Sequence, residues 1–318
     1  MTSTPPGPEY RLDPLTREWV LVVGHRQARP NLPTSDCPFC PGGLEAPEHY
    51  ETRAFTNRWP AVVPGAPVDL AALGLDAGTT TRAPAVGDAE VVLYTPEHTG
   101  SLATIGVAGA RRVVDLWADR TAALLARPEV ASVFVFENRG PEVGATIHHP
   151  HGQIYAFGHI PPVQRREAEV AAEHGCPVCA ALTTDLEDDA RVVHAGAEWI
   201  AEVPFASPYP YGILLAPRRH VGSLPDLDDA ARDGLAVALV DLVARFDRLF
   251  DAVFPYMMWI HQETVPAAPA PGNHLHLHFA PPLRAPGVAL YVAAAEVGSG
   301  VLQNPVTPED AARHLRDA

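Results

Sequence analysis

The sequence predicts an α+β protein made of two tandem repeats, each with an antiparallel sheet and a long helix packed on it. Three repeated features support this prediction: a Cys-x-x-Cys pair, a long stretch of helical apolar spacing, and a strand of alternating histidines near the end of each half. The halves are expected at residues 1–160 and 161–318.

The composition is that of a globular protein. The chain has 318 residues, of which 47% are hydrophobic and 19% are charged, enough for one large core or two ordinary ones. It contains neither a run of eighteen apolar residues nor a basic segment followed by an apolar one, so we expect a cytoplasmic protein with no membrane partner.

Charge and side-chain chemistry exclude several functions. The formal net charge of −15 argues against nucleic acid as the main partner, because binding a phosphate polyanion takes clustered cations. All 23 basic residues are Arg, which excludes a Walker lysine, a Schiff-base lysine and a lysine nucleophile.

Each repeat contains a strand that leads to Gly-Ser-Leu and then to a helix. Residues 91–102 (VVLYTPEHTGSL) and 212–224 (GILLAPRRHVGSL) both run from apolar residues through Pro and His to this tripeptide. Helical apolar spacing follows at about residues 107–125 and 228–249, and Asp residues at the start of the second stretch are good N-caps. We expect one long helix per repeat.

Each repeat then returns to strand. Residues 132–136 and 256–260 are rich in β-branched and aromatic side chains. The closing strands, 149–155 (HPHGQIY) and 274–279 (HLHLHF), alternate histidine with other residues. The Pro-rich segments Pro161-Pro162 and Pro266 to Pro271 are expected to be connections.

Alternation along a strand places every second side chain on one face. A single histidine in such a strand would ordinarily be a hydrogen-bonded core residue, but two matched rows at equivalent places in a repeat favour a functional site. The rows are His149, His151 and Gln153 in the first repeat, and His274, His276 and His278 in the second.

The two Cys pairs, Cys37-Cys40 and Cys176-Cys179, favour metal over disulfide, because nothing in the sequence indicates secretion. The competing interpretation is a redox pair, which predicts a Cys-x-x-Cys beside a helix in a thioredoxin-like unit. The fifteen histidines favour metal.

Two histidines of its own repeat can complete each pair to a tetrahedral zinc site. We expect one or two zinc ions that act in folding and not as Lewis acids. The first predicted set is Cys37, Cys40, His98 and His149, and the second is Cys176, Cys179, His220 and His274.

His151 is the predicted nucleophile. An imidazole attacks phosphorus well when one nitrogen holds the lone pair and the other donates to a fixed carbonyl. Gln153 can donate to a developing phosphoryl oxygen, and Gly152 would let a phosphate approach the backbone. The alternative is that His151 is a third metal ligand, although each zinc set is complete without it.

The opening and active-site segments resemble those of a known family. Residues 13–22 (DPLTREWVLV) and 25–30 (HRQARP) look like an opening strand and arginine turn. Residues 136–140 (FENRG), 144–146 (GAT) and 149–153 (HPHGQ) look like an active-site segment. The family is that of the galactose-1-phosphate uridylyltransferases, a branch of the histidine triad superfamily built from two histidine-triad-like repeats, and the resemblance extends over nearly the whole chain.

The resemblance implies a double displacement, in which His151 attacks the α-phosphorus of UDP-glucose, holds UMP covalently and passes it to galactose 1-phosphate. It also implies that Gln153 steadies the uridylyl group and that Thr146 touches a phosphate. Contacts to nucleotide or phosphate are implied for Arg26, Arg29, Asn57 and Asn138, although the two arginines could instead form an ordinary solvated turn.

Two features complicate the resemblance. Some relatives hold a further metal, often iron, with a Glu and three His that correspond to Glu167, His261, His276 and His278. Because of the second Cys pair, we expect zinc at Cys176, Cys179, His220 and His274, with iron possible in place of that ion or near it. On the strand that receives the sugar phosphate, Leu290-Tyr291 replaces a Lys-Phe pair. Glu296 is then the remaining candidate to meet sugar hydroxyls, and the alternative is that it is an exposed structural residue.

Three functions therefore compete. The first is UMP transfer between hexose 1-phosphates, and the second is an ADP-sugar phosphorylase or a nucleotidylyltransferase for a different sugar 1-phosphate. The third is a nucleotide-binding protein without turnover, against which His151 and Gln153 argue. The resemblance also implies a homodimer with UDP-sugar and sugar 1-phosphate as ligands.

Overall fold

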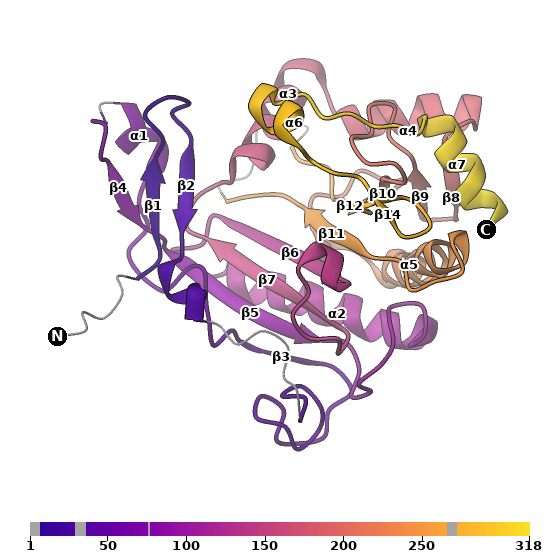
Figure 1. Cartoon of the computed structure of the whole chain (residues 1–318), viewed down its shortest axis with the longest axis horizontal. Helices are drawn as coiled ribbons and strands as arrows, with labels where there is room; N and C mark the ends of the chain where they lie inside the picture. Colours follow the sequence, from indigo (N-terminus) through magenta and orange to yellow (C-terminus); the bar gives the residue numbers. More distant parts are fainter. Residues whose placement is uncertain (1–6, 29–35, 76, 266–271) are drawn as a thin grey trace.

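A nine-stranded antiparallel sheet runs through the whole molecule (Figure 1). The computed structural model describes residues 7–28, 36–75, 77–265 and 272–318, and the strand order is β3-β5-β7-β6-β11-β12-β10-β9-β8. The strands are β3 (Arg53–Thr56), β5 (Gly87–Leu93), β6 (Ser132–Arg139), β7 (His151–Phe157), β8 (Val192–Ala195), β9 (Trp199–Glu202), β10 (Ile213–Pro217), β11 (Tyr256–His261) and β12 (His276–Ala280).

The sheet contains the duplication that the sequence predicts. Strands β3-β5-β7-β6 and β9-β10-β12-β11 follow the same spatial order, and the two sets meet where β6 pairs with β11, with Val135 opposite Ile260. The predicted α+β class with two tandem repeats is confirmed. The two expected sheets are joined edge to edge into one. The expected boundary between residues 160 and 161 lies between β7 and the helix that follows it, and the division into two halves at this point stays a prediction.

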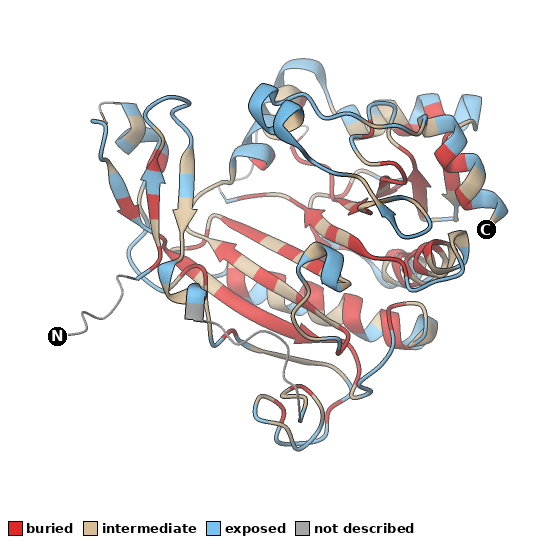
Figure 2. Ribbon diagram, in the orientation of Figure 1, coloured by how far each residue is buried: buried red, intermediate tan, exposed pale blue. Residues whose placement is uncertain are grey.

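Two long helices pack side by side on one face of the sheet. They are α2 (Gly106–Leu125) and α5 (Asp229–Leu249), which confirms both predicted helices. The side chain of Asp228 caps α5 by accepting from the backbone N–H of Ala231 at 2.9 Å. Trp117 and Phe246 are fully buried between these helices and the strands, where Figure 2 shows the buried residues concentrated.

Strand alternation sends the polar and aromatic side chains to the opposite face. Along β7, Gly152, Ile154 and Ala156 are buried, whereas His151, Gln153 and the other alternate positions are half-buried. The two histidine rows therefore lie on the face that α2 and α5 leave uncovered.

Smaller elements surround this core. Strands β1 (Glu9–Leu12), β2 (Trp19–Val22) and β4 (Arg82–Pro84) form a separate sheet in the order β2-β1-β4, which projects from the molecule in Figure 1. The remaining elements are η1 (Gly24–Ala28), α1 (Leu70–Leu75), η2 (Pro141–Val143), α3 (Pro162–His174), α4 (Pro177–Asp188), η3 (Leu224–Asp226), β13 (Leu283–Ala285), β14 (Val288–Ala289), α6 (Ala294–Ser299) and α7 (Pro308–Asp317).

Only one of the two proline-rich segments lies within the described residues. Pro161 is the N-cap of α3 and Pro162 its first residue, so this pair ends the expected connection and starts a helix. The segment from Pro266 to Pro271 lies outside the described residues. Within the described ranges, no helix combines the length and apolar character needed to cross a membrane.

Candidate active site and metal centres

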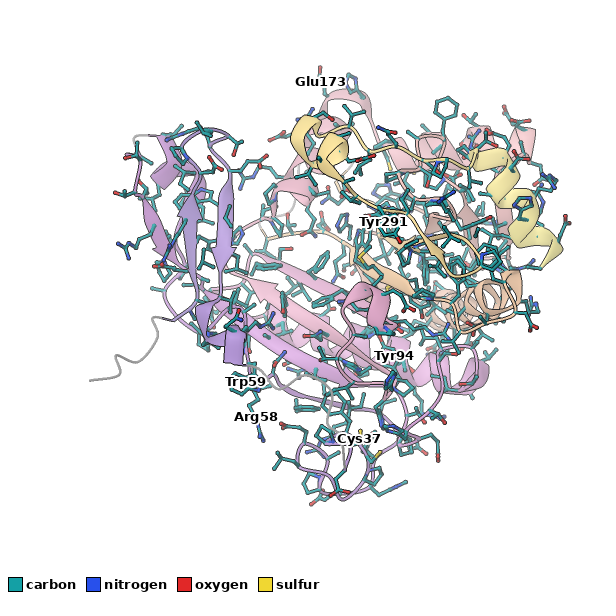
Figure 3. The ribbon with its side chains drawn as sticks, viewed as in Figure 1. Cys37, Arg58, Trp59, Tyr94, Glu173 and Tyr291 are labelled. Atoms are coloured by element: carbon teal, nitrogen blue, oxygen red, sulfur yellow. The ribbon has the colours of Figure 1, made fainter. Side chains whose placement is uncertain are left out.

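The first predicted metal set comes together beside the start of β7. The four ligand atoms of Cys37, Cys40, His98 and His149 lie within 4.8 Å of one another. His149 Nδ1 is 3.8 Å from the Cys37 sulfur and 3.6 Å from the Cys40 sulfur, and His98 Nδ1 is 3.6 Å from the Cys40 sulfur. Cys37 lies in the loop at the lower edge of the molecule in Figure 3.

A buried hydrogen bond fixes the ring of His149. Its Nε2 donates to the carbonyl oxygen of Thr95 at 2.8 Å and lies 2.9 Å from the hydroxyl of Tyr50. With the proton on Nε2, Nδ1 presents its lone pair to the two thiols. Burial lowers the pKa of His149, which keeps the ring neutral, as a metal ligand must be.

The second predicted set repeats this arrangement in the other half. The ligand atoms of Cys176, Cys179, His220 and His274 also lie within 4.8 Å of one another. His274 Nδ1 is 3.5 Å from the Cys176 sulfur and 3.4 Å from the Cys179 sulfur, while its Nε2 donates to the carbonyl oxygen of Pro217 at 3.0 Å. Burial lowers the pKa of His274 to about 4.

The second Cys pair does lie beside a helix, as the redox interpretation requires. Cys176 is the N-cap of α4, and its sulfur accepts from the N–H of Cys179 at 3.4 Å. The surrounding fold is the antiparallel sheet described above, however, and two imidazoles face the thiols. This environment favours metal over a thioredoxin-like redox pair.

A third donor group lies next to the second. Glu167, His261, His276 and His278 also have ligand atoms within 4.8 Å of one another. Glu167 Oε1 is 2.9 Å from His261 Nδ1 and 3.7 Å from His276 Nε2. Although burial acts to raise it, these two histidines hold the pKa of Glu167 well below its usual range. The Cys-His set and the Glu-His set share no residue, so both exist as separate groups.

These groups have the chemistry of metal sites. Burial, together with the neighbouring thiols of Cys37 and Cys176, raises the pKa of both Cys40 and Cys179 to about 11. Two thiolates therefore do not form side by side without a compensating positive charge, which a metal ion supplies. The Cys and His groups can bind metal ions, and the softness of two thiolates with two imidazoles is compatible with zinc.

His151 is held by its backbone and by the loop that carries the first Cys pair. Its Nδ1 donates to the carbonyl oxygen of His149 at 2.7 Å, so Nε2 carries the lone pair of the neutral ring. The Phe39 ring, between Cys37 and Cys40 in the sequence, meets the His151 ring edge to face at 5.1 Å. His151 does not belong to any of the three donor groups found among the described residues.

A cavity of about 180 Å³ opens beside His151 and is called here the first cavity. Gln153 lies in its wall, and its Oε1 accepts from Asn57 Nδ2 at 3.1 Å. Asn57 is in turn held because its Oδ1 accepts from the N–H of Trp59 at 2.9 Å. The lining also includes Phe39, Phe55, Arg58, Trp59, Val91 and Thr146, and Figure 3 labels Arg58 and Trp59 after β3.

His151 also lines a second cavity, of about 360 Å³, together with Glu137, Asn138, Arg139 and His148. Arg139 makes a two-point ion pair with Asp247 at 2.8 and 2.9 Å. Glu137 is buried, and burial raises its pKa to about 7.

Gly152 has a different purpose from the predicted one. A Cβ atom at this position would lie 2.2 Å from the Tyr94 hydroxyl and 3.0 Å from the carbonyl oxygen of Phe136. The side of Gly152 on which a Cβ atom would stand therefore faces the buried interior and not the cavities of His151. The glycine is needed because Tyr94, which is 1% exposed, packs against the strand there.

The remaining predicted residues are less closely gathered. Arg26 donates from Nε to the Trp59 carbonyl at 3.0 Å and from Nη2 to the Tyr155 hydroxyl at 2.9 Å. It therefore contacts a wall residue of the first cavity, Trp59, but is not among the residues that line it. Arg29 lies outside the described residues. Glu296 caps α6 by accepting from the N–H of Ala293 at 3.1 Å, and it is not among the residues that line the two cavities of His151.

Sequence reasoning missed several side chains around His151. Phe39 was given no role, although an aromatic residue between two ligands is a usable signal. Tyr50 and Trp59 carried no such signal, since Tyr50 acts through His149 and Trp59 through Arg26, which are distant in the sequence. Glu137 lies in the matched segment 136–140, but nothing local gives it a role.

Comparisons with known proteins agree over the full length of the chain. Residues 6–161 match the sequence profile described as galactose-1-phosphate uridyl transferase, N-terminal domain, and residues 163–318 match its C-terminal domain. Galactose-1-phosphate uridylyltransferase of Thermotoga maritima is 37% identical, over 97% of this chain and 98% of the relative, and that of Streptomyces lividans is 35% identical, over 97% and 86%.

Solved structures give the same picture. A structure described as uridylyltransferase superimposes with a TM-score of 0.83 at 28% identity, covering 97% of each chain. ADP-glucose phosphorylase from Arabidopsis thaliana, with bound ADP-glucose, has a TM-score of 0.74 at 26% identity, over 98% of this chain and 99% of that one. Since both family profiles match and together span almost every residue, the chain belongs to the galactose-1-phosphate uridylyltransferase family.

Proposed function

We propose that this protein moves UMP between UDP-glucose and galactose 1-phosphate through a covalent uridylyl-His151. The observation that supports this most directly is the hydrogen bond from His151 Nδ1 to the His149 carbonyl, because it selects the tautomer with a nucleophilic Nε2. The relatives named as galactose-1-phosphate uridylyltransferases support transfer of a uridylyl group and the choice of galactose 1-phosphate.

The reaction has two displacements at phosphorus. His151 Nε2 attacks the α-phosphorus of UDP-glucose, a P–N bond forms, and the P–O bond to glucose 1-phosphate breaks. The phosphate oxygen of galactose 1-phosphate then attacks the same phosphorus, and the P–N bond breaks. No separate general base is needed, because sugar phosphates are already ionised at neutral pH.

The side chains around His151 have matching roles. The first cavity holds the base and ribose between apolar and aromatic walls that include Phe39, Phe55 and Val91. Gln153, whose Oε1 is engaged by Asn57, directs its amide N–H toward the phosphoryl oxygens. Thr146, Asn138, Arg26 and Arg29 contribute to nucleotide or phosphate binding, and Glu296 to the sugar.

Zinc is the proposed metal for both Cys-His sets, and its role there is structural. Two thiolates and two imidazoles match the tetrahedral preference of zinc. The Glu-His group has only oxygen and nitrogen donors, which suit iron(II) or zinc. The reaction above uses none of these metals as a Lewis acid.

A homodimer in the cytoplasm is the proposed form. Apolar side chains of the segment after β13, which includes the Tyr291 labelled in Figure 3, are exposed, and such a patch is typical of an interface. Four free cysteines suit a reducing compartment. The exposed members of the patch are Val288, Tyr291, Val292, Val297, Val301 and Leu302.

Intact-mass spectrometry tests the function directly. The purified protein is incubated separately with UDP-glucose and ADP-glucose at mildly alkaline pH, which spares phosphoramidates. A UMP adduct that maps to His151 and disappears when galactose 1-phosphate is added supports the proposal. The His151→Ala variant serves as the control that must remain unmodified.

The other outcomes point elsewhere. An AMP adduct would indicate the second function, an ADP-sugar phosphorylase or related nucleotidylyltransferase, to which the structural relative with bound ADP-glucose draws attention. A UMP adduct that resists galactose 1-phosphate would indicate a different acceptor, consistent with Leu290-Tyr291. No adduct from either donor would favour a binding protein without turnover.

A further inference from the structure

A third cavity, of about 280 Å³, lies in the C-terminal repeat where the first cavity lies in the N-terminal one. Both are lined by a row of three cross-strand neighbours on successive strands. The first row is Phe55, Val91 and Gln153, with Phe55 opposite Val91 and Val91 opposite Gln153. The row in the third cavity is Glu202, Leu214 and His278, paired in the same order.

The histidine beside each row is held in the same way. In the third cavity, His276 Nδ1 donates to the carbonyl oxygen of His274 at 2.7 Å, as His151 does to His149. A residue that stands between the two cysteines of a pair also lines each cavity: Phe39 lines the first cavity and Val178 lines the third. The strand register, the hydrogen bonds of His151 and His276, and the position of each Cys pair all indicate that the third cavity is the duplicate of the first.

The third cavity is lined by buried polar groups that have no hydrogen-bond partner among the described residues. Asn273 is 6% exposed, and neither its Nδ2 nor its Oδ1 has a hydrogen-bond partner within the part of the chain that the structure describes. Glu202 is 2% exposed, and its Oε2 is likewise unpartnered there. Buried groups of this kind cost stability unless a ligand or water satisfies them.

The side chains around the cavity offer a phosphate no arginine. Among the described residues, the lining includes Glu167 and Glu202 but no arginine. Arg191 interacts with Glu202 and lies over the Phe205 ring at 5.3 Å, but it is also ion-paired with Asp185 and Glu309. A phosphate in this cavity would therefore lack the guanidinium partner that phosphates commonly bind in proteins.

We propose that the third cavity binds an uncharged nucleoside, with its base between Val178, Leu214 and Phe205 and its polar edge on Asn273 and Glu202. The Asn273 amide offers one donor and one acceptor side by side, which complements the amide edge of uracil or the amidine edge of adenine. Phe205 is 79% exposed, so its ring is available to stack on a base. The choice of a nucleoside rests on the proposed function, because it takes the first cavity to be the nucleotide site.

The test is equilibrium dialysis of the full-length, metal-loaded protein with labelled uridine or adenosine while UMP saturates the first cavity. The expected result is one nucleoside bound per chain in the presence of UMP. Asn273→Ala should weaken this binding at least about tenfold, since it removes both hydrogen bonds. Ala181→Trp, which fills the cavity from α4, should abolish it, and UMP itself should bind this site at least about tenfold more weakly than uridine.

The matched control is Asn57→Ala, which alters the first cavity and should leave nucleoside binding in the presence of UMP unchanged. Loss of all nucleoside binding under UMP, or binding that both Asn273→Ala and Ala181→Trp leave intact, would overturn the proposal. Failure of the proposed function has a different signature, since it appears as the absence of an adduct from UDP-glucose and does not depend on Asn273.

Discussion

His149 connects the first Cys pair to His151, because its side chain faces the cysteines and its backbone carbonyl holds the ring of His151. Its ring Nδ1 lies 3.6 Å from the Cys40 sulfur, while its backbone carbonyl accepts from His151 Nδ1 at 2.7 Å. A metal ion on the ring would therefore fix the carbonyl that orients the nucleophile. The same connection in the second repeat joins Cys179 to His276 through His274.

Cys37→Ser should lose one metal ion per chain and slow UMP transfer by about 10- to 100-fold. The reason is that Cys37 belongs to the set that supports His151, whereas its counterpart Cys176 belongs to the other repeat. The matched variant Cys176→Ser should also lose one metal ion yet retain transfer within a few-fold. Metal analysis and initial rates check both, and fully metallated Cys37→Ser protein would refute the first site.

His151→Ala should reduce exchange between UDP-glucose and labelled glucose 1-phosphate by at least about 10⁴-fold. The ring lies outside the three donor groups found in the described ranges, so metal content and thermal unfolding should stay at the wild-type level. His174→Ala is a suitable control, since this histidine is solvent-exposed at the end of α3. Exchange at the wild-type rate would disprove covalent catalysis by His151.

Gln153→Ala should slow formation of the uridylyl adduct by about 10²- to 10³-fold, because an amide donor to the phosphoryl oxygens is lost. Asn57→Ala should act more weakly, by about tenfold, since Asn57 contacts the Gln153 Oε1 and acts through it. Single-turnover kinetics with UDP-glucose separates the two. Equal effects in both variants would mean that Asn57 touches the reacting groups itself.

Much of this architecture is predictable because the repeat makes independent signals agree. Helices α2 and α5 are long and each buries a row of residues along one side, and each Cys pair is followed in the same order by two histidines of its own repeat. The pairing of β6 with β11 was not predictable, since only long-range contact specifies which strand edges meet. Helices α3 and α4 were missed because they are shorter and bury few apolar residues, which leaves little apolar pattern to detect.

Side-chain roles were predictable only where chemistry and spacing coincide. His151 and Gln153 lie together in the first cavity as their alternation implies. The role of Gly152 was misjudged, because nothing local reveals that Tyr94 packs against it. Glu137 was missed for the same reason: its environment is made by Tyr94, Arg139 and Tyr256 from three different strands or strand ends.

Glu137 gives the structure a pH dependence that can be isolated. Burial raises its pKa from 4.5 to about 7, despite the opposing influence of Arg139. In the unfolded chain the group ionises near its ordinary value, so between about pH 4.5 and 7 the folded state binds the extra proton. Raising the pH through this window destabilises the folded state, by up to about 3 kcal/mol.

Glu137→Gln should therefore raise the midpoint of thermal unfolding relative to wild type at pH 8, at roughly 2 °C per kcal/mol. The difference should shrink as the pH falls and should vanish below about 4.5, where wild-type Glu137 becomes protonated in both states. Comparing the two proteins at each pH cancels the protonation of metal ligands, which they share. Glu173→Gln, at a side chain that is 76% exposed, should show no such trend, and a constant offset between Glu137→Gln and wild type would mean that Glu137 is already ionised in the folded protein across this range.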